Sequence, residues 1–268
     1  MPPNPLHSQN TYQSAPHSEL SPLSEGAALP LFRQVKRRLL KLIEARHYKP
    51  GDNLPSETEL GSALAVSIGT VRKAVDELVF ENILIRRQGK GTFVTQHNPD
   101  RFLFQFFHVE RRDSDFAQEP EYPDVQCVGF EKTRASEAQA QALGLRVNDP
   151  VFSFGNRLLL QGRATVYDHI VLSALSFKGL TEKRLIERKG TIYQLYQEDY
   201  GISVLRTRES ARAVAASREA CRILAVPSGL PVIQVHRIAL TFGDKPVEYR
   251  ISTIDTREHD YVNMLVKR

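Results

Sequence analysis

The 268-residue sequence predicts an α+β protein with two domains, a small helical domain with a β-hairpin and a larger domain around one antiparallel sheet. Three observations lead to this prediction. Residues 31–80 carry apolar side chains at helical spacing, residues 83–95 form two short extended runs around glycines, and the chain from about residue 104 alternates hairpins with short helices.

Composition and the N-terminal segment limit the possible classes of protein. The sequence predicts a disordered tail over residues 1–29, rich in Pro, Ser, Asn and Gln, with neither a secretory signal nor a transmembrane helix anywhere in the chain. Cys127 and Cys221 stand apart, and the eight histidines show no metal-ligand spacing. We therefore expect a cytoplasmic protein without a metal site or a cofactor.

The basic charge is concentrated in one part of the chain. Residues 31–95 hold 12 Lys and Arg against 7 Asp and Glu, a net of +5 that equals the charge of the whole protein. A local excess of cations is what attraction to a phosphate backbone requires.

The first two helices are predicted from periodicity and end signals. Leu31, Val35, Leu39, Leu42 and Ile43 form the apolar stripe of the first helix, which ends near residues 46–48 before Pro-Gly. The second helix spans about 56–64, where Ser and Glu three residues apart form a capping box.

A third helix and a hairpin complete the first domain. Ser67 caps this helix, whose first turn exposes small and hydroxylated side chains that let the backbone approach phosphates and bases closely. Residues 83–87 and 92–95 are the predicted strands, with glycines at the tip and Arg86, Arg87 and Lys90 as cations. This order of elements is that of a winged helix-turn-helix, which places one helix in the major groove of DNA. A helical hairpin with a solvated basic face is the alternative interpretation.

The second domain contains two similar halves. Extended runs over 124–133, 151–160, 164–172, 202–216, 230–242 and 246–255 are the predicted strands, and 136–143, 191–200 and 217–224 the predicted helices. ASEAQAQALGLRVNDPVFSFGNRLLLQGRATVYDHIVL has the same layout as ASREACRILAVPSGLPVIQVHRIALTFGDKPVEYRISTI. The repeat predicts pseudo-symmetry, with a cleft where the halves meet.

The run PGDNLPSETEL…SIGTVRKAVDELVFENILIRRQGKGTFV resembles the DNA-binding domain of the GntR family of bacterial transcription regulators. The resemblance covers residues 30–95, with Thr58 and Ile68 at two positions where relatives often have arginine. It implies a set of DNA-binding residues on the second helix, the third helix and the wing: Ser56, Glu57, Thr58, Ser67, Ile68, Gly69, Thr70, Arg72, Lys73, Gln88, Gly89 and Lys90. Glu57 is expected to orient a neighbouring side chain.

Residues 104–268, after a linker over 96–103, resemble the UTRA effector-binding domain of the HutC branch, which shares the chorismate-lyase fold. The motifs GTIYQLYQEDYGI and GDKPVEYRISTID are its clearest marks. Relatives usually carry Arg-x-Arg and a later carboxylate in the first hairpin, and these positions hold Asn156, Leu158 and Asp168 here. The effector-binding residues that the resemblance and the strand alternation suggest are His108, Asn156, Arg157, Asp168, Glu248 and Arg250. Alternation along the strand aims Arg157 at the face opposite Asn156.

The resemblance implies a homodimeric repressor that a small anionic or polar metabolite releases from a palindromic DNA operator. Two alternatives stay open: a DNA-binding protein without an effector, and a lyase-like enzyme that uses the C-terminal fold. Against the enzyme, the sequence lacks G-x-S-x-G, H-E-x-x-H and P-loop motifs. A metabolite that raises the melting temperature would favour the regulator over the protein without an effector.

Overall fold

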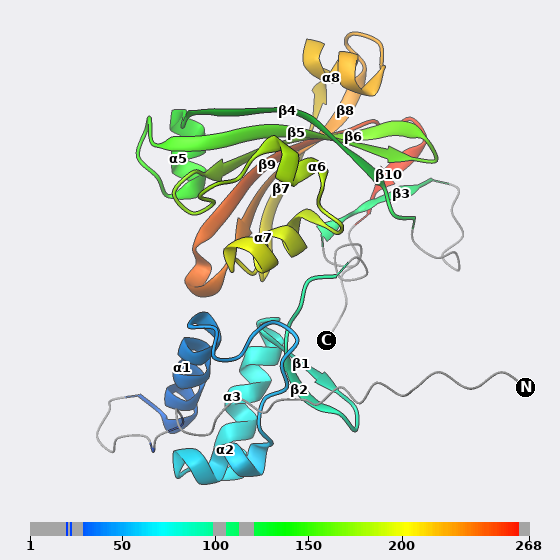
Figure 1. The fold of residues 1–268 in the computed structure, drawn as a ribbon. Helices are drawn as coiled ribbons and strands as arrows, with labels where there is room; N and C mark the ends of the chain where they lie inside the picture. The colour runs from blue at the N-terminus through cyan, green and yellow to red at the C-terminus, as the bar shows by residue number, and fades with distance from the viewer. Residues whose placement is uncertain (1–19, 21, 23–28, 99–105, 113–120, 263–268) are drawn as a thin grey trace, which may run out of the picture. The chain divides into compact units, whose positions relative to one another are not determined.

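The computed structural model describes residues 20, 22, 29–98, 106–112 and 121–262, and the chain divides into two compact units at residue 96 (Figure 1). Most of the predicted tail over 1–29 and most of the predicted linker over 96–103 lie outside the described residues. In the described ranges, no helix has the length and apolar character needed to cross a membrane.

The described residues of unit 1 form three helices and a two-stranded hairpin (Figure 1). The elements are α1 (Leu31–Glu44), α2 (Glu57–Leu64), α3 (Ile68–Phe80), β1 (Leu84–Arg87) and β2 (Gly91–Val94). The predicted capping box is present, since Ser56 Oγ accepts from the Glu59 N–H while Glu59 Oε2 accepts from the Ser56 N–H. These elements are the predicted helix-turn-helix and wing.

The core of unit 1 follows the predicted stripe of α1 except at its start. Val35, Leu39, Leu42 and Ile43 are buried against α3. The prediction for Leu31 is wrong, because its side chain is 50% exposed. Leu31 is the first residue of α1 and lies a full turn before the buried stripe begins.

Unit 2 is built on a six-stranded antiparallel sheet in the order β4-β5-β6-β9-β8-β7. Its strands are β4 (Asp124–Arg134), β5 (Pro150–Leu160), β6 (Arg163–Ser173), β7 (Arg206–Ala215), β8 (Pro231–Leu240) and β9 (Pro246–Ile254). Its helices are α5 (Glu137–Leu143), α6 (Glu182–Ile186), α7 (Ile192–Tyr200) and α8 (Arg218–Leu224). The remaining strands β3 (Val109–Arg111) and β10 (His259–Tyr261) pair with each other.

Alternate side chains of the sheet pack against different layers. Val151 and Val171 contact α5, and Tyr167 contacts α8. Phe154 and Ile170 point to the other face, where they pack with the tyrosines of α7. A strand sends successive side chains to opposite faces, so every residue of β5 and β6 is assigned to one layer or the other.

The strand order reflects the internal repeat. Each half contributes a strand, a short helix and a hairpin, and the two hairpins meet where β6 pairs with β9. Helices α5 and α8 begin at serines whose hydroxyls accept from the third residue of the helix. The topology therefore agrees with the predicted duplication.

Four of these helices and strands differ from the prediction, and each difference has a local cause. Strand β7 begins at Arg206 and not at residue 202, because the Ile202 N–H bonds to the Tyr196 carbonyl and finishes α7. Val204 then packs in the core beside that helix. The short elements α6, β3 and β10 were not predicted, since each is too short for a periodic pattern to show.

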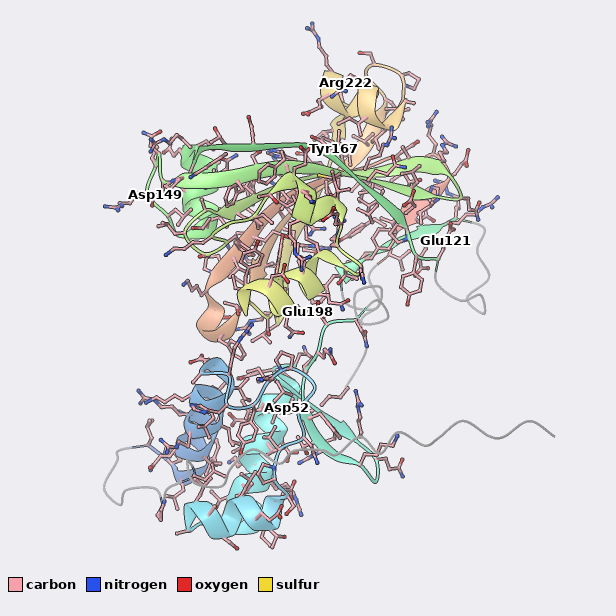
Figure 2. All side chains as sticks on the ribbon, in the orientation of Figure 1. Asp52, Glu121, Asp149, Tyr167, Glu198 and Arg222 are labelled. Atoms are coloured by element: carbon pink, nitrogen blue, oxygen red, sulfur yellow. The ribbon has the colours of Figure 1, made fainter. Side chains whose placement is uncertain are left out.

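Gly155 provides a stability test. An added Cβ there would lie 2.7 Å from the Val128 carbonyl oxygen and 2.9 Å from the ring of Tyr167. Tyr167, labelled in Figure 2, is fixed because its hydroxyl donates to Glu219 of α8 at 3.0 Å. Overpacking should make Gly155→Ala less stable by about 1–3 kcal/mol in urea unfolding. Ser210→Ala, on the exposed strand β7, is the control and should stay within about 0.5 kcal/mol.

Candidate functional sites

The first turn of α3 is exposed, and its polar groups are organised by its cap. Ser67 Oγ accepts from the Thr70 N–H at 3.2 Å and lies 2.9 Å from Thr70 Oγ1. Gly69 leaves the turn without a side chain, and Ile68 is 43% exposed. The turn therefore offers an apolar group, hydroxyls and the positive end of a helix dipole on one surface.

Glu57 joins α2, α3 and the wing. Its carboxylate accepts from Arg72 Nε of α3 and from Arg86 Nη2 of β1, both at 2.8 Å. Arg86 also pairs with Asp76. As expected, Glu57 orients neighbouring cations, and the position of Arg72 depends on it.

The other predicted DNA-binding residues occupy different environments. Thr58 and the wing tip Gln88, Gly89 and Lys90 are exposed. The Ser56 hydroxyl is used within the capping box, where it donates to Glu59 at 2.8 Å. The Lys73 ammonium lies 4.1 Å from the ring centre of Phe32 on α1, which draws this cation toward the helix behind it.

Unit 2 contains a cavity of about 280 Å³ between the sheet and the start of α7. Three of the predicted effector residues line it, Asn156 on β5, Asp168 on β6 and Arg250 on β9. Leu158 adds an apolar wall. On the opposite side the lining comes from the loop before α7, including Arg188, Lys189, Gly190 and Thr191.

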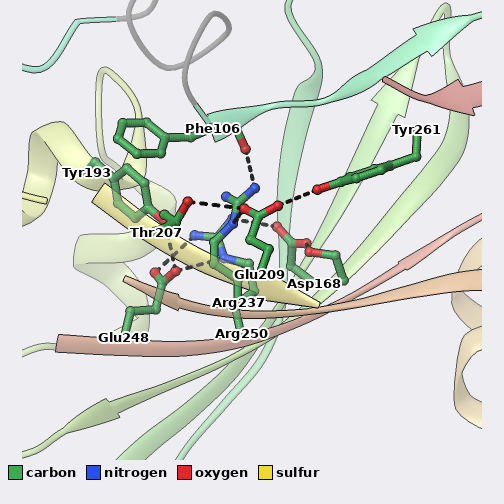
Figure 3. Close-up of polar contacts among 10 residues, drawn as sticks. Phe106, Asp168, Tyr193, Thr207, Glu209, Arg237, Glu248, Arg250 and Tyr261 are labelled. Carbon is green, nitrogen blue, oxygen red and sulfur yellow. Dashed lines mark hydrogen bonds and ion pairs between the residues drawn. The ribbon is translucent and has the colours of Figure 1, made fainter. Parts of the chain in front are cut away.

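A cluster of buried charges forms the floor of this region (Figure 3). Arg250 donates to both carboxylate oxygens of Glu248 at 2.9 and 3.0 Å and to Asp168 at 2.9 Å. On the neighbouring strand, Arg237 pairs with Glu209. We call Asp168, Glu209, Arg237, Glu248 and Arg250 the ion cluster.

Helix α7 and the β3–β10 pair are tied to the ion cluster. The hydroxyls of Tyr193 and Tyr196 donate to the two oxygens of Glu248, at 3.1 and 2.7 Å. Arg237 donates to the Phe106 carbonyl, and the Tyr261 hydroxyl donates to Glu209 (Figure 3). The cluster thus joins the sheet to α7 and to the β3–β10 pair.

The protonation of the cluster follows from burial and pairing. Burial disfavours the charge on Arg250, yet Glu248 and Asp168 outweigh it and raise the pKa of Arg250 well above its usual value. Burial would raise the pKa of Glu209, but the Arg237 guanidinium holds it below the usual range. Burial lowers the pKa of His108, which favours the neutral imidazole.

Three of the predicted effector residues do not line the cavity. His108 lies in a separate, smaller recess beside Arg237 and Tyr261. Glu248 is fully buried and does not line the cavity, but its carboxylate accepts from Arg250 and so fixes the position of a residue that does. Arg157 faces the other side of β5, as its alternation predicted, where it donates to Gln126. We therefore no longer include Arg157 among the effector-binding candidates.

Several residues of this region were missed from the sequence. Arg237, Glu209, Arg188 and Lys189 carried no motif. One sequence pattern could have indicated an anion-binding edge at the start of α7. Arg-Lys-Gly directly precedes the Thr-x-x-Gln that caps this helix. The described residues hold no group of three or more His, Cys, Asp or Glu suited to a metal ion.

Comparisons with known families fit both units. The model of the bacterial regulatory proteins of the gntR family matches residues 31–94, and that of the UTRA domain matches residues 121–260. The chain belongs to the GntR family and carries a UTRA domain. Unit 1 is the helix-turn-helix of this family, and unit 2 is the antiparallel-sheet UTRA domain.

Relatives of this GntR-family protein include named repressors. The protein named "Probable fructoselysine utilization operon transcriptional repressor" of Escherichia coli K12 is 29% identical over 239 residues, covering 85% of this chain and 96% of that protein. The histidine utilization repressor of Pseudomonas putida is 28% identical, covering 84% and 87%. The crystal structure of the ligand-binding domain of a GntR-family regulator from Bordetella bronchiseptica is 32% identical, with a TM-score of 0.56, covering 61% of this chain and 99% of that one.

The ion cluster gives a stability prediction for the UTRA domain. Glu248→Ala leaves the buried Arg250 without its bidentate partner and two tyrosine hydroxyls without their acceptor. We expect unfolding free energy to fall by roughly 3–5 kcal/mol in chemical denaturation. The control Glu198→Ala, exposed on α7, should change it by under about 0.5 kcal/mol. A loss below about 1 kcal/mol for Glu248→Ala would contradict the role of the cluster.

Proposed function

We propose that this protein is a transcription repressor that binds a DNA operator through α3 and the wing and is released by a small-molecule effector in the UTRA domain. The observation that carries the proposal is the uncovered first turn of α3, which lies in the same unit as a basic wing. The names of the relatives support repression, as opposed to activation, of transcription.

DNA contact is assigned by chemistry to two groups of residues. Ser67, Gly69, Thr70 and Arg72 are proposed to meet phosphates and base edges, and Ile68 is suited to the methyl group of thymine. Thr58, Gln88, Gly89 and Lys90 are proposed to reach the adjacent backbone or minor groove. We further propose a homodimer in the cytoplasm, which would present two copies of α3 to the half-sites of a palindromic operator.

Hydrogen bonds within the UTRA domain connect the surroundings of its cavity to the segment that leads to unit 1, the DNA-binding unit, which we call the reader. The His97 N–H donates to Gln197 of α7 at 2.9 Å, and the Phe106 carbonyl accepts from Arg237 of the ion cluster. The described residues on both sides of 99–105 are thus attached to α7 and to the ion cluster, which both contribute to the lining of the cavity. A ligand that shifts α7 changes both attachments, and this route supports release of DNA by an effector.

No catalytic step is part of this proposal. The family and the names of the relatives are those of transcription regulators. The charged groups of the cavity floor are engaged with each other, since Arg250 donates to both Glu248 and Asp168. We propose that the cavity binds its ligand and does not transform it.

A DNA-binding measurement tests the function. Operators selected from a random DNA library should bind at least about 10³-fold more tightly than random duplex in a gel-shift assay at physiological salt. The affinity should fall steeply as salt rises, because phosphate contacts release counterions. Equal affinity for selected and random DNA at physiological salt would overturn the operator-specific regulator.

The Glu57 contacts predict a change of specificity. In Glu57→Gln the carboxylate that holds Arg72 and Arg86 is gone, so the ratio of operator to random affinity should fall roughly tenfold. Affinity for random DNA should stay equal or rise, because one negative charge is removed. Glu44→Gln removes the same charge at the end of α1 and should leave the ratio unchanged. The same fall in Glu44→Gln would attribute the effect to net charge.

A further inference from the structure

We propose that the cavity of the UTRA domain binds a zwitterion, with its cationic group at Asn156 beside the ion cluster and its anionic group at Arg188 and the start of α7. The proposal rests on the proposed function, since this ligand would be the effector. It assigns the chemical class of the ligand and the two ends of the site that read it.

Asn156 is the polar group of the floor that lacks a partner. Its side chain lines the cavity while the residue is only 2% exposed, and its Oδ1 has no hydrogen-bond partner in the described part of the chain. A buried amide oxygen without a donor is costly unless a ligand supplies one. Rotation of the amide by 180° exchanges its oxygen and nitrogen, so the oxygen can be presented to the cavity.

The charge around Asn156 favours a cationic donor. The ion cluster holds two guanidinium groups and three carboxylates, a formal charge of −1. Asp168 of this cluster is the cross-strand partner of Asn156 and also lines the cavity. A buried excess of negative charge is stabilised by a positive group nearby, so an ammonium or another N–H cation suits this end better than a neutral hydroxyl.

The opposite side of the cavity carries the other sign. Arg188 is half-buried, donates to the Leu185 carbonyl and has no carboxylate within ion-pair distance among the described residues. Burial lowers the pKa of Arg188, as expected for a cation that lacks a counter-ion. Lys189 lies beside it, and α7, nine residues long, begins at the same edge. The N–H groups of that first turn attract an anion.

The walls between the two ends are largely apolar. Val125, Leu158 and Ile186 line the cavity, and Tyr122 adds an exposed ring at its lip. The carboxylates among the lining residues, Asp124 and Asp168, both belong to the strands, whereas Arg188 and Lys189 belong to the loop. The one lining cation of the described strands, Arg250, is neutralised by Glu248 and Asp168. The volume of about 280 Å³ is small for a ligand site. These features suit a molecule of amino-acid size with charged ends and an apolar middle.

A series of matched probes tests the proposal on the full chain. The probes are ω-amino acids of four to eight carbons, the fatty acids and alkylamines of the same lengths, and inorganic phosphate, all at equal ionic strength. Binding is measured by thermal shift and by titration calorimetry. At least one ω-amino acid should bind about tenfold or more tightly than the fatty acid and the amine of its own length, because only it uses both ends.

Variants separate the two ends. Arg188→Gln should lower the affinity of the best ω-amino acid to that of the amine, and Asn156→Leu should lower it to that of the fatty acid. Asn156→Asp keeps an acceptor and adds a negative charge, so it should retain the ω-amino acid and provides a test should the leucine variant not fold. Lys183→Gln removes an exposed cation of α6 outside the cavity lining and should change nothing.

The outcomes distinguish this inference from the proposed function. Equal binding of fatty acid and ω-amino acid, tighter binding of phosphate, or no binding by any ω-amino acid at 20 mM would overturn the zwitterion. Each of these results leaves the operator measurement, made without ligand, unaffected. Failure of selected DNA to bind above random duplex would instead overturn the regulator, even if a zwitterion occupies the cavity.

Discussion

The structure of the UTRA domain depends on the position of Arg250 between Glu248 and Asp168. These three side chains come from the two strands at which the halves of the sheet meet, and nearly all of their surface is buried. A buried guanidinium is tolerable only when its donors are matched by acceptors. The same carboxylate of Glu248 accepts from two tyrosines of α7, so the arginine also fixes the helix that borders the cavity.

The sequence predicted the elements well where local signals were strong. Serine and threonine caps, glycine ends and period-2 runs located the three helices of the reader and both hairpins of the second domain, because these signals act within a few residues. Leu31 failed because periodicity does not show where along a helix burial begins. The route by which Arg237 reaches Phe106 was invisible, since it joins residues 131 positions apart.

The reader and the UTRA domain place their charged residues by similar means. In the reader, Glu57 of α2 accepts from Arg72 of α3 and from Arg86 of β1, and so sets the position of arginines that lie 15 and 29 residues away in the sequence. In the UTRA domain, Glu248 does the same for Arg250. In both cases the residue type at the contact surface was predictable, but its orientation comes from a carboxylate elsewhere in the fold.

The duplicated halves have diverged at equivalent positions. Asn156 follows the leading proline of its strand by six residues, and so does Arg237 in the other half. Their cross-strand partners are Asp168 and Arg250. In the half with β8 and β9, the two positions hold Arg237 and Arg250, which pair with carboxylates of the ion cluster. In the half with β5 and β6, the Asn156 amide oxygen has no partner among the described residues. Over their described residues, the two similar halves thus contribute one buried and unpaired amide oxygen between them, and each chain should bind one ligand molecule, not two.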